Sequence, residues 1–456
     1  MKEFTQDDIE RISSIIAADN SEAAHAELAD LHPADIAELF QQLDTEQSEY
    51  LFRLLDEDTA ADVLMELDED ERLKLIEDMP AEEIAKQIDH LDTDDAVDLI
   101  QQLDEEERDE IISHIDDVEQ AGDIIDLLKY DEDTAGGLMG TEMIVVNENW
   151  SMPECIKQMR LQAEDMDEIY YVYVVDNDYR LRGTLPLKMM LTHPSVSKIK
   201  HVMEADPVSV KADTPIDEVA LDFEKYDLVA MPVVDSIGRL LGRITVDDVM
   251  DQVRESSERD YQLASGLSSD VDADDSVIAQ TKARIPWLLV GIASGILASV
   301  ILGAFEAQLQ AVTALALFIP IIGGTGGNVG VQASAIVVQG LANGSLEVKE
   351  FARQLGKETL IGLLNATIIT AVVLAYNLIV MPGELAVTIS VAVSLFVVVM
   401  FASILGTVIP LTLEKIHINP ALATGPFIQI MNDLFGIIIY VQVATFFLDK
   451  LGSGGL

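Results

Sequence analysis

The sequence predicts a multidomain protein made of an acidic all-α helical solenoid, two α+β modules in tandem, a connecting helix and an all-α domain with five transmembrane spans. Three observations predict this order: a 12-residue repeat in the N-terminal part of the chain, an internal duplication after it, and long apolar runs towards the C-terminus. We expect domain boundaries at 1–130, 137–200, 201–254 and 285–449, with the connecting helix at 246–275.

Charge is distributed unevenly along the 456 residues, which carry 28 Lys and Arg against 81 Asp and Glu, a formal net charge of -53. Only seven basic and eight acidic residues follow residue 280, which leaves 21 and 73 before it. A surface this acidic repels nucleic acid and attracts metal cations. Divalent cations are therefore expected partners, and nucleic acid is not.

Cys155 is the only cysteine, which excludes a framework of disulfides. The N-terminal sequence, "MKEFTQDDIERISS", lacks the apolar core of a secretory signal peptide. We therefore expect the acidic part of the chain to lie in the cytoplasm.

The acidic repeat starts at residue 43 and places an aspartate at the same phase of most units, while Pro80 takes this place once. The recurring residues are Asp44, Asp56, Asp68, Asp92 and Asp104. Each is suited to begin a short helix as an N-cap or a first-turn residue, with apolar residues at helical spacing behind it. The acids fit a solvated surface, but so many like charges repel one another that shared divalent ions would relieve the repulsion.

The duplication is visible in "YYVYVVDNDYRLRG" and "VAMPVVDSIGRLLG", which align so that Val175 matches Val234 and Asp176 matches Asp235. Each copy predicts a strand, a turn, a second strand and a helix. This pattern resembles a tandem pair of CBS domains.

CBS pairs often bind adenine nucleotides, and a Thr-x-x-Asp element contacts the phosphate and the ribose. The second copy carries it as Thr245 and Asp248, whereas the first has Pro186 and Met189 instead. This departure favours regulation without a nucleotide and leaves ATP open as a ligand at Thr245 and Asp248.

The helix predicted from residue 246 is amphipathic, with Val246, Val249, Met250 and Val253 on one face. It is either a linker packed against its neighbours or a lever that connects a sensor to the membrane domain.

Five apolar runs are long enough to cross a bilayer. They cover 285–305, 309–342, 360–380, 385–413 and 420–448. Basic residues gather before the first span, between the second and third, and between the fourth and fifth, at Lys282, Arg284, Lys349, Arg353, Lys357 and Lys415. Because cytoplasmic loops are enriched in such residues, we expect a cytoplasmic N-terminus and an outer C-terminus, with Lys450 as the exception.

Five glycines interrupt the second run in "PIIGGTGGNVGVQASA". No Gly-Lys-Ser/Thr follows, so this is not a phosphate-binding loop. The glycines allow either close helix packing or a helix break that turns carbonyl groups towards a permeation path. The nearby Asn328 and Gln332 favour the break and make both residues pore-lining candidates.

Asp433 lies in the fifth span, where a carboxylate in the hydrocarbon core costs free energy. Spans two to five contain no Lys, Arg or His that could pair with it. Transient binding of a cation to the carboxylate best explains an acid at this position, and a hydrogen bond to Asn432 is the structural alternative. Oxygen ligands suit a hard ion, and Mg²⁺ binds through few carboxylates while it keeps its water shell. In a homodimer, two Asp433 side chains could flank one hydrated Mg²⁺.

The arrangement as a whole is similar to the MgtE family of Mg²⁺ channels. The resemblance rests on "GGTGGNVGVQ", "INPALATGPF" and "MNDLFGIIIY" in the spans, with support from "YDEDTAGGLM" and "RITVDDVMD". It implies a homodimer in the cytoplasmic membrane whose cytosolic acids bind Mg²⁺ and close the pore. It also implies that Asp433 is the pore metal ligand, and Asn432, Gly425 and Pro426 complete the pore-lining candidates.

The resemblance further implies a set of regulatory metal ligands, at Asp62, Asp94, Asp98, Asp217, Asp227, Asp248, Asp251 and Asp260. The chain departs from the family pattern where acids occur in other members, at Pro215, Ser256, Arg259 and Asn419, and Val331 and Ala333 replace polar residues in the glycine motif.

Three other functions stay open from the sequence: a transporter of divalent cations such as Co²⁺, Mn²⁺ or Ni²⁺, an antiporter with Asp433 as its proton site, and a nucleotide-sensing membrane regulator. An enzyme is not expected, because no nucleophile–base set, phosphate loop or metal-hydrolase spacing is found.

Overall fold

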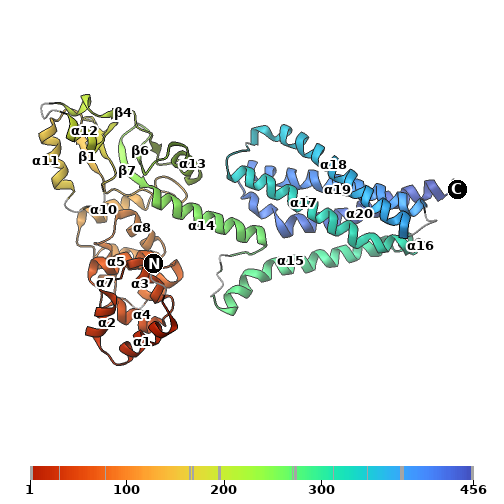
Figure 1. Cartoon of the computed structure of the whole chain (residues 1–456), viewed down its shortest axis with the longest axis horizontal. Helices are drawn as coiled ribbons and strands as arrows, with labels where there is room; N and C mark the ends of the chain where they lie inside the picture. Colours follow the sequence, from red (N-terminus) through yellow and green to blue (C-terminus); the bar gives the residue numbers. More distant parts are fainter. Residues whose placement is uncertain are drawn as a thin grey trace. The chain divides into compact units, whose positions relative to one another are not determined.

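The computed structural model describes residues 4–29, 31–77, 79–163, 166, 169–193, 197–269, 271, 275–311, 313–346, 348–380 and 385–452. The chain forms two compact units, Met1–Val253 and Arg254–Leu456 (Figure 1). The first contains the acidic helices and the α+β modules, and the second contains the apolar helices.

The acidic domain consists of short helices, as the repeat predicts. They are α1 (Gln6–Ala17), α2 (Ser21–Leu28), α3 (Pro33–Phe40), α4 (Thr45–Phe52), α5 (Glu57–Glu66), α6 (Glu69–Ile76), α7 (Ala81–Ile88), α8 (Thr93–Gln101), α9 (Glu105–Ile112) and α10 (Val118–Leu127). The side chains of Asp44, Asp56 and Asp104 each accept a hydrogen bond from a backbone N–H in the first turn that follows, which confirms them as N-caps.

Two arginines, one buried and one half-buried, cap the C-terminal ends of α5 and α8. The Arg72 guanidinium donates to the carbonyl oxygens of Leu64, Met65 and Leu67 at the end of α5. Arg108, which lies three repeat units later, donates to two carbonyls at the end of α8 in the same way. Carboxylates thus satisfy N–H groups at helix starts, and guanidinium groups satisfy carbonyls at helix ends.

The α+β modules form two sheets. The segment that forms the first sheet consists of β1 (Ile144–Asn147), helix α11 (Met152–Gln162), β2 (Val172–Val175), β3 (Leu181–Leu185), helix α12 (Leu187–Thr192), the 3₁₀ helix η1 (Ile199–His201) and β4 (Glu204–Ala205). The segment that forms the second sheet consists of β5 (Val210–Lys211), helix α13 (Ile216–Tyr226), β6 (Ala230–Val234) and β7 (Leu240–Thr245). The strand orders are β1-β2-β3-β4 and β5-β6-β7, so β4 joins the first sheet although it lies beyond residue 200.

The duplication extends to details of the pairing. In both sheets the first two strands are parallel and the next pair is antiparallel. The antiparallel register shifts between Val174 and Val175 in the first sheet and between Val233 and Val234 in the second. These positions match one another in the alignment of the two copies.

The connecting helix α14 (Val246–Ser265) ends before the predicted boundary at 275. The division between the two units falls within it, after Val253. Its predicted apolar face is only partly covered, because Val249 is buried while Met250 is exposed.

The second unit contains α15 (Val277–Ala304), α16 (Glu306–Ala311), η2 (Thr313–Phe318), α17 (Ile319–Ala342), η3 (Val348–Glu350), α18 (Phe351–Val380), α19 (Leu385–Lys415), η4 (Pro420–Ala423) and α20 (Gly425–Gly452). Within the described residues, five helical segments are long and apolar enough to cross a membrane, in agreement with the sequence. Helix α19 lies at the centre and packs against α17, α18 and α20.

The predicted helix break at the glycines is wrong, because α17 runs without interruption from Ile319 to Ala342. A Cβ atom on Gly330 would collide with the Asn432 side chain, and one on Gly406 would collide with the carbonyl oxygen of Gly330. The glycines therefore bring α17 into close contact with α20 and α19, as the alternative of close helix packing requires.

A buried acid that the sequence pattern does not indicate lies between α18 and α19. Glu358 is only 4% exposed and accepts a hydrogen bond of 2.5 Å from the Ser403 hydroxyl. A Cβ atom on Gly362 would lie 2.8 Å from this hydroxyl, so the glycine makes room for the bond. The predicted third span begins at residue 360, and Glu358 therefore falls outside it.

Candidate cation sites

Asp433 lies on α20 against the glycine face of α17. A Cβ atom on Gly323 would come within 3.2 Å of its Oδ1, and one on Gly327 within 4.0 Å. Gln429, one helical turn earlier, covers Gly327 in the same way, at 3.4 Å to its Cγ. The glycines therefore leave space in which a carboxylate and an amide lie on one face of α20.

The Asp433 carboxylate is half-buried, and among the described residues it makes neither an ion pair nor a hydrogen bond. The alternative that it bonds to Asn432 is therefore not observed. Asn432 itself is 1% exposed, and neither its Oδ1 nor its Nδ2 has a partner in the described part of the chain. A buried amide without partners costs about 1–3 kcal/mol. Asn432 faces Gly330 in the contact between α17 and α20.

The other pore-lining candidates lie apart from Asp433 within one chain. Asn328 and Gln332 are exposed, one helical turn apart on α17. Gly425 and Pro426 lie at the start of α20, where they meet the end of α14. Gly425 has a φ of 38° and its Cα faces the carbonyl oxygen of Ala264, so a side chain there would be strained and would also collide.

One hydrogen bond links α14 to the residues before α20. The Asn419 Nδ2 donates to Asp260 Oδ1 at 2.8 Å, while its own Oδ1 accepts from the backbone N–H of Ala421 at 2.8 Å. The second bond fixes the amide so that its NH₂ group points at the carboxylate. Asp260, predicted as a regulatory metal ligand, is thus held by an amide.

A cluster of carboxylates lies in the first unit, where the start of α8 meets the segment before β1. Oxygen atoms of Asp92, Asp94 and Glu142 lie within 4.8 Å of one another, which suits a divalent cation. The repeat places Asp92 at the N-cap of α8, but its side chain makes no capping bond. Glu142 supplies this contact instead and accepts from the backbone N–H and the hydroxyl of Thr93, both at 3.1 Å.

Arg243 on β7 and Asp248 on α14 border the same cluster. The Arg243 Nη2 pairs with Asp92 Oδ2 at 3.1 Å, and its Nε donates to the backbone carbonyl of Glu142. Asp248 accepts from the backbone N–H of Thr245 at 3.0 Å and from its hydroxyl. The cluster is therefore built from three segments that are far apart in the sequence.

Burial and mutual repulsion raise the pKa of the carboxyl groups in this cluster. Burial is the larger cause at Asp94, whose pKa is well above its usual value, and the Asp248 charge adds to it. The pKa of Asp95 is raised to about 7 by burial, followed by the charges of Asp248 and Asp98. Burial also raises the pKa of Glu142. These groups resist losing their protons unless a positive charge joins them.

Comparison with known proteins identifies the family. Residues 319–443 match MgtE, described as a divalent cation transporter, residues 31–133 match the MgtE intracellular N domain, and residues 135–194 and 199–255 match CBS domains. The magnesium transporter MgtE of Thermus thermophilus is 36% identical over 332 residues, which cover 71% of this chain and 72% of the relative. The chain belongs to the MgtE family. The Bacillus subtilis MgtE is 30% identical over 325 residues, with 71% and 72% covered.

A solved structure supports the MgtE assignment of the first unit. The cytosolic domain of the Mg²⁺ channel MgtE in complex with ATP is similar with a TM-score of 0.51 and 31% identity, and the match covers 54% of this chain and 99% of that one. The predicted family and the predicted fold class, including the CBS pair and the five apolar spans, are confirmed.

The structure brings two of the predicted regulatory acids of this MgtE-family chain together, Asp94 and Asp248. Asp98 lies on α8 one turn after Asp95, and its charge adds to the raised pKa of Asp95. The remaining predicted acids lie on other elements: Asp62 on α5, Asp217 at the start of α13, Asp227 just after its end, and Asp251 and Asp260 on α14. Sequence reasoning missed Asp95, Glu142 and Arg243 as members of the cluster. The repeat identifies Asp92 only as a helix cap, because its partners in the cluster come much later in the chain.

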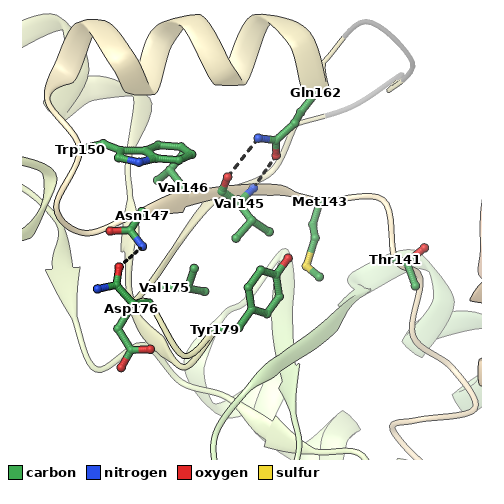
Figure 2. Close-up of a pocket in the computed structure, with 11 residues that line it drawn as sticks. Thr141, Met143, Val145, Val146, Asn147, Trp150, Gln162, Val175, Asp176 and Tyr179 are labelled. Atoms are coloured by element: carbon green, nitrogen blue, oxygen red, sulfur yellow. Dashed lines mark hydrogen bonds between the residues drawn. The ribbon is translucent and has the colours of Figure 1, made fainter. Parts of the chain in front are cut away.

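The nucleotide element does not form an open site. Thr245 is buried, and its hydroxyl and backbone N–H are both bonded to Asp248. A cavity of about 440 Å³ lies in the first CBS module, between β1, α11 and the turn after β2, and neither residue lines it (Figure 2). Two of its polar side chains are engaged, since Gln162 bonds to the backbone of Val145 and Asn147 bonds to Asn177.

The raised pKa of Asp95 predicts a pH-dependent stability of the first unit when divalent cations are removed. Between about pH 4 and pH 7 the folded state keeps a proton that the unfolded chain releases, so this contribution to stability is present below about pH 4 and lost as the pH rises through about 7. Thermal unfolding of the full chain in EDTA should therefore show a melting temperature that falls over this range. Asp95→Asn should flatten the fall.

The exposed Glu46→Gln is the matched control, because it removes one acid outside the cluster. Added Mg²⁺ should raise the melting temperature more at pH 8 than at pH 5. A profile of Asp95→Asn as steep as that of the wild type would contradict the assignment of this pKa.

Proposed function

We propose that this chain is an Mg²⁺-selective channel for uptake across the cytoplasmic membrane and that cytosolic Mg²⁺ closes it. One observation carries the transport part: the Asp433 carboxylate lies half-buried in the last span, over the glycines of α17, and has no partner among the described residues. A carboxylate in that position costs several kcal/mol unless a cation or water meets it. A hydrated Mg²⁺ fits, because it binds through few carboxylates and keeps most of its waters.

We also propose that the chain forms a homodimer. The apolar window of α15 is not buried within the chain, and Asn328 and Gln332 are exposed on α17. A second copy could cover such surfaces and place the two Asp433 residues on either side of one path. The basic residues before α15 and around the start of α18 favour a cytoplasmic N-terminus and an outer C-terminus.

Regulation is proposed to use the cluster of Asp92, Asp94, Asp95, Glu142 and Asp248. Because these groups repel one another across the contact between the acidic helices and the CBS pair, an ion shared among them would strengthen that contact. The other predicted acids could contribute further ions on their own surfaces. ATP is a second regulatory candidate, since the related cytosolic domain was solved with it, but binding through Thr245 and Asp248 would first have to break their mutual bonds.

The end of α14 could transmit this signal within the second unit. It meets the residues before α20 through the Asp260–Asn419 bond, the contact of Gly425 with Ala264, and the contact of Gly266 with Pro426. These contacts all lie at the start of the span that carries Asp433. A helix end held there would obstruct an ion path, and its release would open it.

The transport proposal predicts that Asp433→Ala lowers Mg²⁺ flux into liposomes about tenfold or more, because the permeating ion loses its only charged ligand in the span. Asp449→Ala on the same helix is the control and should leave flux near the wild-type level. The flux should not require a proton or sodium gradient, which separates a channel from an antiporter. Competition with Co²⁺, Mn²⁺ and Ni²⁺ measures the selectivity. Full flux in Asp433→Ala would refute the proposal.

The gating proposal predicts different effects of two substitutions at Asp260. Asp260→Ala removes the acceptor for Asn419 and should raise the residual Mg²⁺ flux at high cytosolic Mg²⁺, where the wild-type channel is closed, by about fivefold. Asp260→Asn keeps an acceptor oxygen and should behave like the wild type. Asn419→Asp would place two carboxylates in contact and open the channel, and adding Asp260→Asn to it should restore closure. If Asp260→Asn is as open as Asp260→Ala, Asp260 acts as a cation ligand and not as a hydrogen-bond acceptor.

A further inference from the structure

The carboxylate cluster of the first unit already contains a cation of its own. Arg243 is only 7% exposed, and its guanidinium pairs with Asp92 on one side and bonds to the backbone of Glu142 on the other. Both residues belong to the triad whose oxygen atoms lie within 4.8 Å of one another. A guanidinium that is always protonated therefore stands beside the place where a divalent ion would bind.

The backbone and the surroundings hold Arg243 in place. Its N–H and carbonyl both pair with Gly140, two residues before Glu142. The Tyr170 ring lies 5.6 Å from the centre of the guanidinium. The first contact fixes the backbone of Arg243 and the second lies against its guanidinium. Since neither contact involves an acid, the charge would stay in place when an ion arrives. The ion would then have to share Asp92 with Arg243.

We propose that Arg243 is a built-in counter-ion that sets the Mg²⁺ concentration at which this cluster fills. It neutralises one of the carboxylates, which preserves the contact between α8 and β7 when the ion is absent. It also repels a divalent ion from the remaining acids, which keeps the affinity low and places the response in a range of higher cytosolic Mg²⁺. This inference rests on the proposed regulatory role of the cluster.

The two effects of Arg243, on the contact between α8 and β7 and on the affinity for Mg²⁺, can be measured separately. Without the guanidinium, the acids repel one another more strongly at zero Mg²⁺, and the contact between α8 and β7 is weaker. With Mg²⁺ the same variant binds the ion more tightly, since no fixed positive charge opposes it. A residue with a purely structural role would weaken the contact at every Mg²⁺ concentration and leave the midpoint of the Mg²⁺ response unchanged.

The test is the Mg²⁺ dependence of the melting temperature of the purified full chain. Arg243→Gln should lower the Mg²⁺ concentration that gives half of the maximal stabilisation by about three- to tenfold, which corresponds to the loss of one repulsive charge. Arg243→Lys keeps the positive charge but loses the forked contact of the guanidinium. Its midpoint should therefore stay much closer to that of the wild type than to that of Arg243→Gln. Arg239→Gln is the matched control, because it makes the same charge change at an exposed position of the same module.

Several outcomes decide between the inference and the function on which it rests. If Asp94→Asn leaves the Mg²⁺ response intact, the cluster is not the cation site and the proposed regulation fails. If Asp94→Asn abolishes the response but Arg243→Gln keeps or raises the midpoint, the role of Arg243 is overturned alone. A neutral variant that folds only after Mg²⁺ is added supports the inference, because the ion then replaces the guanidinium. If Arg243→Gln and Arg243→Met both fail to fold, Arg243→Lys decides, and a midpoint far from that of the wild type refutes the inference.

Discussion

A carboxylate removed from water needs a positive charge or a hydrogen-bond donor, and this requirement shapes both units of the molecule. In the acidic helices it is met by backbone N–H groups, where aspartates cap helices at regular intervals. In the cluster around Asp94 the donors are too few for the acids, and Arg243 supplies one charge among several carboxylates. In the membrane unit, Glu358 has a hydroxyl donor, whereas Asp433 has no donor among the described residues.

The contrast between Glu358 and Asp433 shows how similar acids acquire different roles. Both lie on helices that can span a membrane, and glycines make room for both. At Glu358 the space is filled by Ser403, which gives a closed contact between two helices of the same chain. At Asp433 the glycines of α17 offer no side chain, so the carboxylate stays available to water or an ion. The same small residue therefore makes room for a structural bond in one place and for a carboxylate without a partner among the described residues in the other.

Much of this architecture could be predicted from the sequence because its signals are local. Caps such as Asp44 and Asp104, the internal duplication and the apolar runs each depend on patterns along the chain. In the cluster around Asp92, the family resemblance points to Asp94 and Asp248 only. The other members could not be predicted, since the role of Asp92 changes when Glu142 takes over its capping contact and Arg243 pairs with it. The predicted break in α17 is wrong for a related reason. Five glycines lower helix propensity locally, but packing against α19 and α20 keeps the helix intact.

The contact between α14 and the segment before α20 depends on Asn419 being an amide and not a carboxylate. Its carbonyl oxygen is committed to the backbone of Ala421, so only the NH₂ group can meet Asp260. A carboxylate at this position would present an oxygen to an oxygen, and an ion would have to join them. With an amide, the contact between α14 and the start of α20 closes without any ion. The proposed dependence of gating on cytosolic Mg²⁺ would then lie mainly in the first unit, where the carboxylates outnumber the positive charge beside them.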